Sequence, residues 1–215
     1  MSQLRIMLQN ESGFTLVEVL FVAVIFPLVF VAVFSVMDMA NVIFNMNGAY
    51  ARVSHNAMQT LRTISREVGQ SNPLASANRL VITTDQNDNE TVAFQIPVDW
   101  DNDGDVVTND VAPETEWGAY SQVGQTTNGL LDSWARYSVV GEQLIREVLD
   151  SAQTAVAGSE RVIANNVTSF QISQVGDSLV MTITLDVPDE IGQEGSERVL
   201  SSTFTSRTLL RNAVS

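Results

Sequence analysis

The chain has 215 residues and a formal net charge of −14, from 25 acidic residues and 11 arginines, with no lysine. A balance this acidic excludes binding to nucleic acid through a general basic field. Cysteine is absent and His55 is the only histidine, which excludes disulfides, thiolate metal sites, thiol nucleophiles and sites built from several histidines. The length fits one domain with attachments and a sizeable core.

The first predicted element is a membrane-spanning helix at residues 14–37. This run is apolar except for Glu18, and about 20 apolar residues span a bilayer as a helix. It is longer than the apolar region of a secretory signal, and no small-x-small cleavage site follows it. Arg5 precedes the run and Arg52 is the first basic residue after it, which favours a cytoplasmic N-terminus and a remainder outside the cytoplasm.

Two residues inside this run have consequences of their own. An unpaired carboxylate at mid-membrane costs about 2–3 kcal/mol or more, and less near the headgroups. The charge of Glu18 therefore indicates either a cationic partner or a position at the headgroups. Pro27 removes one backbone hydrogen bond and predicts a kink in the helix.

An amphipathic helix is predicted to continue the first one over residues 38–70. Apolar residues recur there every three or four positions, and Gly69 and Pro73 end the pattern. The whole helix from Phe14 to Val68 would be roughly 80 Å long at about 1.5 Å per residue. A coiled coil is disfavoured because the pattern is short and lacks flanking charge pairs. The predicted apolar stripe consists of Val42, Met46, Ala49, Tyr50, Val53, Ala57, Leu61, Ile64 and Val68.

The stripe must pack on another part of the chain, whereas the residues off the stripe should meet solvent. His55 is expected to be a solvated surface residue. The charged residues expected off the stripe are Arg52, Arg62, Arg66 and Glu67.

The rest of the chain reads as strands separated by turns. Two β-rich runs within residues 79–98 flank an Asn/Asp turn and predict a hairpin. Trp134–Val140 and Glu142–Val148 predict a second pair, with Gly141 between them. Asn166–Val175 and Leu179–Val187 have alternating apolar residues and predict a third pair around the turn signal Gly176-Asp177. The fold class is therefore predicted to be α+β, with one long N-terminal helix, apolar in its first half, packed on an antiparallel β-sheet head.

Several segments of the head are less regular. Residues 113–133 predict a loop, residues 150–160 are open between a loop and a short helix, and residues 199–210 between a last strand and a short helix. The acidic pairs in loop-like sequence are expected to be solvated surface rather than catalytic carboxylates. These residues are Glu114, Glu116, Asp189, Glu190 and Glu194.

An acidic loop at residues 99–110 has the spacing of a calcium-binding loop. Carboxylates stand at positions 1, 3 and 5, glycine at position 6 and a carboxylate at position 12, which is the EF-hand arrangement of hard oxygen ligands. Gly104 lets the chain turn back so that a backbone carbonyl at Asp105 can join. The predicted calcium ligands are Asp99, Asp101, Asp103, Asp105 and Asp110.

The surrounding sequence limits this prediction to the loop itself. The last ligand is aspartate, as in dockerin-type loops, and the flanks read as strand and loop rather than as two helices. Residues 85–116 contain ten acidic residues and no basic one, and crowded carboxylates repel one another without a cation. The alternative is a flexible acidic loop whose charges are separated by water.

The start of the apolar run, Gly13 to Leu20 with the sequence GFTLVEVL, resembles the processing motif of type IV prepilins and pseudopilins. The resemblance implies that residues 1–13 are a leader, that a prepilin peptidase cuts between Gly13 and Phe14, and that it methylates the new amine of Phe14. It also implies that Glu18 pairs with the N-terminal amine of a neighbouring subunit. The remaining parts are then the filament-core helix 14–37, its continuation 38–70 and the periplasmic head 71–215.

Three segments downstream resemble, more loosely, PilW-like minor pilins and the J-type pseudopilin of type II secretion. They lie at Leu61–Val68, Val162–Phe170 and Leu209–Asn212. The function they imply is a non-enzymatic minor subunit, anchored by one pass in the inner membrane and then part of a filament, with other pilin subunits as partners. No small-molecule substrate is expected. The alternatives are a major pilin that forms the shaft and a membrane-anchored, calcium-dependent enzyme or binding protein.

Overall fold

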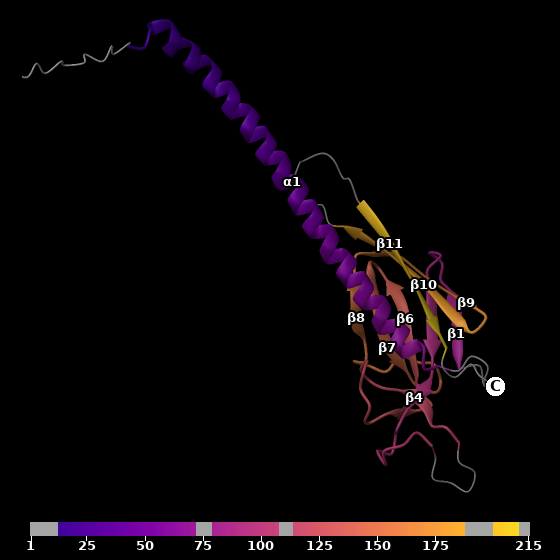
Figure 1. Ribbon diagram of the computed structural model, residues 1–215. Coiled ribbons are helices and arrows are strands. Elements are labelled where there is room, and N and C mark those ends of the chain that lie inside the picture. The colour runs from indigo at the N-terminus through magenta and orange to yellow at the C-terminus, as the bar shows by residue number, and fades with distance from the viewer. Residues whose placement is uncertain (1–12, 72–78, 108–113, 188–199, 211–215) are drawn as a thin grey trace, which may run out of the picture. The chain divides into compact units, whose positions relative to one another are not determined.

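The computed structural model describes residues 13–71, 79–107, 114–187 and 200–210 (Figure 1). The chain divides into two compact units, Met1–Met46 and Asn47–Ser215. One helix, α1 (Leu16–Val68), runs through the boundary between them, and the described strands all belong to the second unit. The predicted class is confirmed: the fold is α+β, with one long N-terminal helix and antiparallel sheets.

In the first unit, α1 is apolar on every face, and none of the described residues covers its membrane-length segment. The helix begins at Leu16, two residues after the predicted start, and continues through Pro27. The kink expected at Pro27 stays a prediction. Large apolar side chains from Phe14 to Met46 are exposed, and the helix is long and apolar enough to cross a membrane. Exposed apolar surface of this extent requires lipid or other chains around it.

In the second unit, α1 is amphipathic, as predicted. Ala57, Leu61, Ile64 and Val68 are at most 3% exposed and belong to the hydrophobic core. His55 is exposed, which confirms its expected place at the surface. The helix ends at Val68, and the amide of Gly69 still donates to the carbonyl of Ser65 over 3.0 Å. The stripe from Ala57 to Val68 therefore joins this part of the helix to the strands. The packing expected of Val42, Met46 and Tyr50 was wrong, because these side chains are 38%, 39% and 53% exposed.

The strands of the second unit form three antiparallel sheets. One sheet has the order β1-β2-β6-β7-β8, the second β11-β10-β9, and the third β3-β4-β5. Their bounds are β1 Leu80–Thr84, β2 Glu90–Phe94, β3 Ile96–Pro97, β4 Trp117–Ala119, β5 Leu130–Leu131, β6 Trp134–Val140, β7 Gln143–Leu149, β8 Arg161–Asn165, β9 Val167–Val175, β10 Ser178–Val187 and β11 Leu200–Leu209.

The three predicted hairpins are confirmed. β1 pairs with β2, β6 with β7, and β9 with β10. The open alternatives resolve as a last strand, β11, and as turns and loop over residues 150–160. The prediction of a loop for residues 113–133 was wrong in part, because β4 and β5 lie within it. β8 was not predicted, since its five residues show no clear alternation of burial.

Two predictions about acidic residues were wrong. Glu67 is 4% exposed and Glu116 is 2% exposed, although both were expected at the surface. Glu67 is buried because Arg146 of β7 lies against it, with a nitrogen–oxygen distance of 2.5 Å, and the hydroxyl of Tyr137 donates to it over 2.6 Å. Glu116 is buried against the acidic loop, where its Oε2 accepts the amide of Trp100 over 3.2 Å. Glu114 is exposed, and residues 189, 190 and 194 lie outside the described residues.

Tyr137 shares the buried site of Glu67 and is fully buried itself. Burial raises the pKa of its hydroxyl well above the ordinary value, and the neighbouring Glu67 carboxylate raises it further. The folded protein therefore keeps this proton at a pH where the unfolded chain loses it.

This pKa shift predicts a loss of stability in alkaline solution. The contribution of Tyr137 is fully present below the unfolded pKa of about 10 and is lost as pH rises beyond it, by about 1.4 kcal/mol per pH unit for one proton. The chain has no lysine or cysteine, so the tyrosines dominate side-chain titration in this range. Denaturant unfolding between pH 9 and 11 should show a shallower decline for Tyr137→Phe. Tyr50→Phe, at a position 53% exposed, should behave like the unsubstituted protein.

Candidate functional site

The first candidate site is the start of α1. Gly13, Phe14 and Thr15 precede the helix, and Phe14 is 82% exposed. The amide of Thr15 donates to Glu18 Oε2 over 3.0 Å, and the amide of Glu18 donates to Thr15 Oγ1 over 3.3 Å. This reciprocal pair is a capping box, which satisfies two amides at a helix start.

The capping box is a feature that the sequence interpretation missed. Its signal was present in the spacing Thr15-x-x-Glu18. A second bond from Thr15 Oγ1 to Glu18 Oε2, of 3.0 Å, ties the hydroxyl to the same oxygen. Within a single chain, the carboxylate of Glu18 thus has polar partners at its own helix end.

The second candidate site is the acidic loop after β3. Asp99, Asp101 and Asp103 each offer one carboxylate oxygen, and these oxygens lie within 4.8 Å of one another. The structure thus brings together three of the five predicted ligands. Asp105 is exposed and its Oδ1 accepts the amide of Val107 over 2.8 Å. Asp110 lies outside the described residues.

Hydrogen bonds within the loop fold it back on itself. Gly104 has a φ of 100°, a conformation that L side chains rarely adopt. Its amide therefore reaches Asp99 Oδ2, over 3.1 Å. The amides of Asp103 and Asp105 donate to the carboxylates of Asp101 and Asp103, over 3.2 and 3.0 Å. The loop is thus closed through its own backbone, and its carboxylates converge although Asp101 and Asp103 are exposed.

One carboxylate oxygen of the loop lacks a hydrogen-bond donor among the described residues. Asp99 Oδ1 is buried and has no hydrogen-bond partner among the described residues. A buried acceptor without a partner costs about 1–3 kcal/mol, and more when it is charged. The second oxygen of this carboxylate, Oδ2, accepts the amide of Gly104, so Oδ1 is the oxygen of Asp99 that lacks a partner among the described residues.

Neighbouring segments hold the loop in place. Glu116 Oε2 accepts the amide of Trp100 over 3.2 Å, and the hydroxyl of Tyr120 accepts the amide of Asp99 over 3.0 Å. Gly129 approaches so closely that a Cβ there would lie 2.7 Å from Val98 Cβ, and its amide donates to the carbonyl of Asp99 over 3.1 Å. The loop is therefore fixed at its first two residues.

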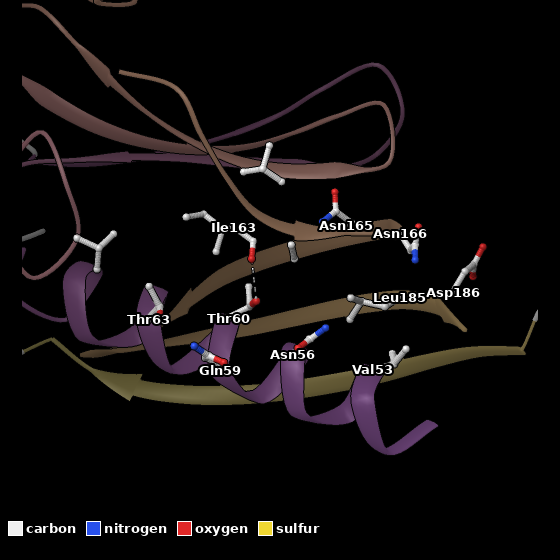
Figure 2. A pocket seen from close by; sticks show the side chains of 13 residues that line it. Val53, Asn56, Gln59, Thr60, Thr63, Ile163, Asn165, Asn166, Leu185 and Asp186 are labelled. Carbon is white, nitrogen blue, oxygen red and sulfur yellow. Dashed lines mark hydrogen bonds between the residues drawn. The ribbon is translucent and has the colours of Figure 1, made fainter. Parts of the chain in front are cut away.

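A third feature is a pocket of about 560 Å³ between α1 and the strands β8 and β10 (Figure 2). The hydroxyl of Thr60 donates across it to the carbonyl of Ile163 over 3.5 Å. Among the described residues that line the pocket, Asp186 is the one ionisable side chain. The lining residues are Val53, Asn56, Gln59, Thr60, Thr63, Val123, Val162, Ile163, Ala164, Asn165, Asn166, Leu185 and Asp186.

No protein-family model, curated protein or solved structure matches this chain.

Proposed function

We propose that this chain is a structural subunit of a type IV pilus or of a type II secretion pseudopilus. The observation that carries the proposal is the sequence from Gly13 to Leu20 at the start of a helix that is apolar on every face and unburied in its own chain. Such a helix needs lipid before assembly and neighbouring helices after it. The resemblance to prepilins supplies both environments, and it supplies a cation for Glu18.

The proposed mechanism has three steps. The precursor inserts in the inner membrane with its N-terminus inside and its head in the periplasm. Prepilin peptidase cleaves after Gly13 and methylates the amine of Phe14. Glu18 then pairs with the Phe14 amine of an adjacent subunit, and the apolar helices pack together. Glu18 thereby exchanges part of its capping role for an intermolecular ion pair, and the chain itself catalyses no step.

A minor subunit is favoured over a major one. The head predicted at residues 71–215 is large for a protein that forms a filament shaft, and the loose downstream matches point to PilW-like and J-type proteins. A minor subunit primes assembly or sits at the filament tip. The amount of this chain in sheared filaments separates the two roles, because a shaft protein dominates that fraction.

The proposed role of Glu18 predicts that Glu18→Gln is processed but excluded from filaments. Glutamine retains the capping box, since glutamine serves at that position as well as glutamate, but it removes the charge. We expect the variant to fall tenfold or more in the sheared-filament fraction, because about 1.4 kcal/mol already changes an equilibrium tenfold. The measurement is an immunoblot of sheared filaments against the membrane fraction.

Two control variants separate the charge from the cap. Thr15→Ala removes the capping hydroxyl and keeps the charge, and we expect it to assemble nearly normally. Asp38→Ala removes an exposed carboxylate from the same helix and should have no effect. If Glu18→Gln assembles normally and Thr15→Ala is missing from the sheared-filament fraction, then assembly depends on the cap and not on the ion pair.

We also propose that the acidic loop binds calcium. Three carboxylates that converge within 4.8 Å, and the buried Oδ1 of Asp99 that lacks a partner among the described residues, suit a cation that prefers six to eight oxygen ligands. Asp99, Asp101 and Asp103 would hold the ion, with a backbone carbonyl at Asp105 and the carboxylate of Asp110 as the predicted further ligands. The ion would fix the shape of the head and would take part in no reaction.

Calcium should therefore raise the melting temperature of the full chain in detergent micelles. An ion present at 100 times its Kd adds about 2.7 kcal/mol to stability. That corresponds to roughly 5–10 °C for a domain of 150–250 residues. Asp101→Ala combined with Asp103→Ala should abolish the shift, which differential scanning calorimetry measures.

Glu142→Ala combined with Glu160→Ala is the matched control, because it removes two exposed carboxylates elsewhere in the head. It should retain the full shift with calcium. An unsubstituted protein whose melting temperature does not respond to millimolar calcium would refute this assignment and leave the filament proposal unaffected.

A further inference from the structure

A continuous path of hydrogen bonds leads from the end of α1 to the acidic loop. It begins at Glu67, whose carboxylate is bound by Arg146 through Nε at 3.0 Å and through Nη2 at 2.5 Å. The same Nη2 donates to the carbonyl of Tyr120 over 2.7 Å. The hydroxyl of Tyr120 then accepts the amide of Asp99 over 3.0 Å.

Tyr120 is the residue that joins the two halves of this path. Its main-chain carbonyl is bound by Arg146, and its side chain reaches the first position of the loop. The next carbonyl, of Ser121, accepts Arg146 Nη1 over 3.3 Å. Arg146 therefore clamps two consecutive peptide units of the segment that carries the tyrosine.

Three residues of the path are buried, and its last bond, to Asp99, is partly buried. Arg146 is 0% exposed, Glu67 4% and Tyr120 8%. Desolvation of Arg146 works against its charge, but the hydrogen bond and the charge of Glu67 outweigh it, so the pKa of the guanidinium is raised. Hydrogen bonds to charged groups contribute about 1.5–3 kcal/mol, more than neutral ones. Arg146 thus holds Tyr120 firmly only while Glu67 is in place.

We infer that Glu67, Arg146 and Tyr120 are positioning residues for the acidic loop. They fix the backbone of Asp99, and through it the carboxylate that Gly104 and the other aspartates surround. The effect on calcium affinity rests on the proposed calcium site, whereas the positioning of the loop does not.

Positioning of this kind works in both directions. If the path raises the affinity of the loop for calcium, then calcium must strengthen the hold on Glu67 by the same factor. The packing of the last turn of α1 on β7 is therefore linked to occupancy of the loop. An ion in the head would stiffen the end of the helix that also carries the filament-forming segment.

The first test uses no metal. Hydrogen exchange is measured on the full chain in detergent micelles, with the amide of Gly104 as the reporter because it donates to Asp99 Oδ2. Tyr120→Phe removes only the hydroxyl, and Glu67→Gln weakens the clamp at its far end. Both should speed exchange at Gly104 by about three- to tenfold, the effect of losing one hydrogen bond. The amides of β10 should stay protected.

Glu147→Gln is the matched control. Glu147 of β7 pairs with Arg136 of β6 at 2.8 Å, at a partly exposed site. Among the described residues, its side chain bonds to Arg136 and not to Glu67, Arg146 or Tyr120. It should leave exchange at Gly104 unchanged. Equal exchange in Tyr120→Phe and the unsubstituted protein would overturn the inference, and so would acceleration in Glu147→Gln as large as in Glu67→Gln.

The second test is calcium titration by isothermal calorimetry. Tyr120→Phe and Glu67→Gln should weaken calcium binding by about three- to tenfold, and Glu147→Gln should not. Unchanged calcium affinity in both path variants would overturn the link to the ion. If the unsubstituted protein binds no calcium but the path variants still exchange faster at Gly104, the positioning role is supported and the calcium site is refuted.

Discussion

The variant Gly13→Val should accumulate as a full-length precursor that starts at the original N-terminus. A peptidase that cuts after Gly13 must approach the backbone there, and a branched side chain would block that approach. The unsubstituted chain, purified from its native membrane, should start at N-methyl-Phe14. Intact-mass and N-terminal peptide mass spectrometry distinguish the two products, and the expected effect is a complete loss of the mature form.

The space around Gly13 can accommodate a larger side chain. A Cβ added at Gly13 would meet no atom of the described residues within 4 Å, so the substitution should not disturb the fold. Gly48→Val is the control, because a Cβ at Gly48 in α1 also meets nothing within 4 Å. It should be processed normally. An unsubstituted chain that retains its first 13 residues in cells with active prepilin peptidase would end the filament proposal.

The second large effect is expected from Arg146→Met. The substitution preserves much of the side-chain length but leaves the Glu67 carboxylate buried without its cation. Breaking a buried ion pair by removing one partner costs about 3–5 kcal/mol. The free energy of unfolding, measured by denaturant titration of the full chain in detergent, should fall by that amount.

Two comparisons identify the cause of that loss. Arg136→Met breaks the partly exposed pair with Glu147 and should cost at most about 1 kcal/mol. Adding Glu67→Met to Arg146→Met removes the stranded charge and should restore part of the stability. A single Arg146→Met variant as stable as Arg136→Met would show that the buried pair is not a stability determinant.

Much of the fold could be predicted from local patterns. Two patterns predict α1. Residues 14–37 are apolar over the length of a membrane span, and from there to Val68 apolar residues recur every three or four positions. The spacing of apolar residues alone shows whether a helix has one apolar face or is apolar all round. Apolar residues at every second position in Leu179–Val187, and a less regular alternation in Asn166–Val175, predict a hairpin around the turn at Gly176 for the same reason. The spacing of Asp99, Asp101, Asp103 and Gly104 likewise predicted a loop whose carboxylates turn inward.

The errors concern residues whose burial depends on a distant partner. Glu67 lies beside the helix stripe, and its charge favours solvent unless an arginine arrives from 79 residues away. A signal for that arginine was present, because Arg146 lies on the same face of β7 as the buried residues Leu144 and Val148. Glu116 was missed because its acceptor role serves a backbone amide of the loop, which no side-chain pattern reveals.

The sequence by itself determined the helix, the hairpins, the N-terminal motif and the acidic loop, since each depends on neighbours within a few positions. The tertiary structure alone decided the order of strands in the three sheets, the burial of Glu67 and Glu116, and the path from α1 through Tyr120 to Asp99. These features depend on contacts between segments far apart in the chain. A buried charge is tolerated only where such a contact supplies its counter-charge and hydrogen bonds.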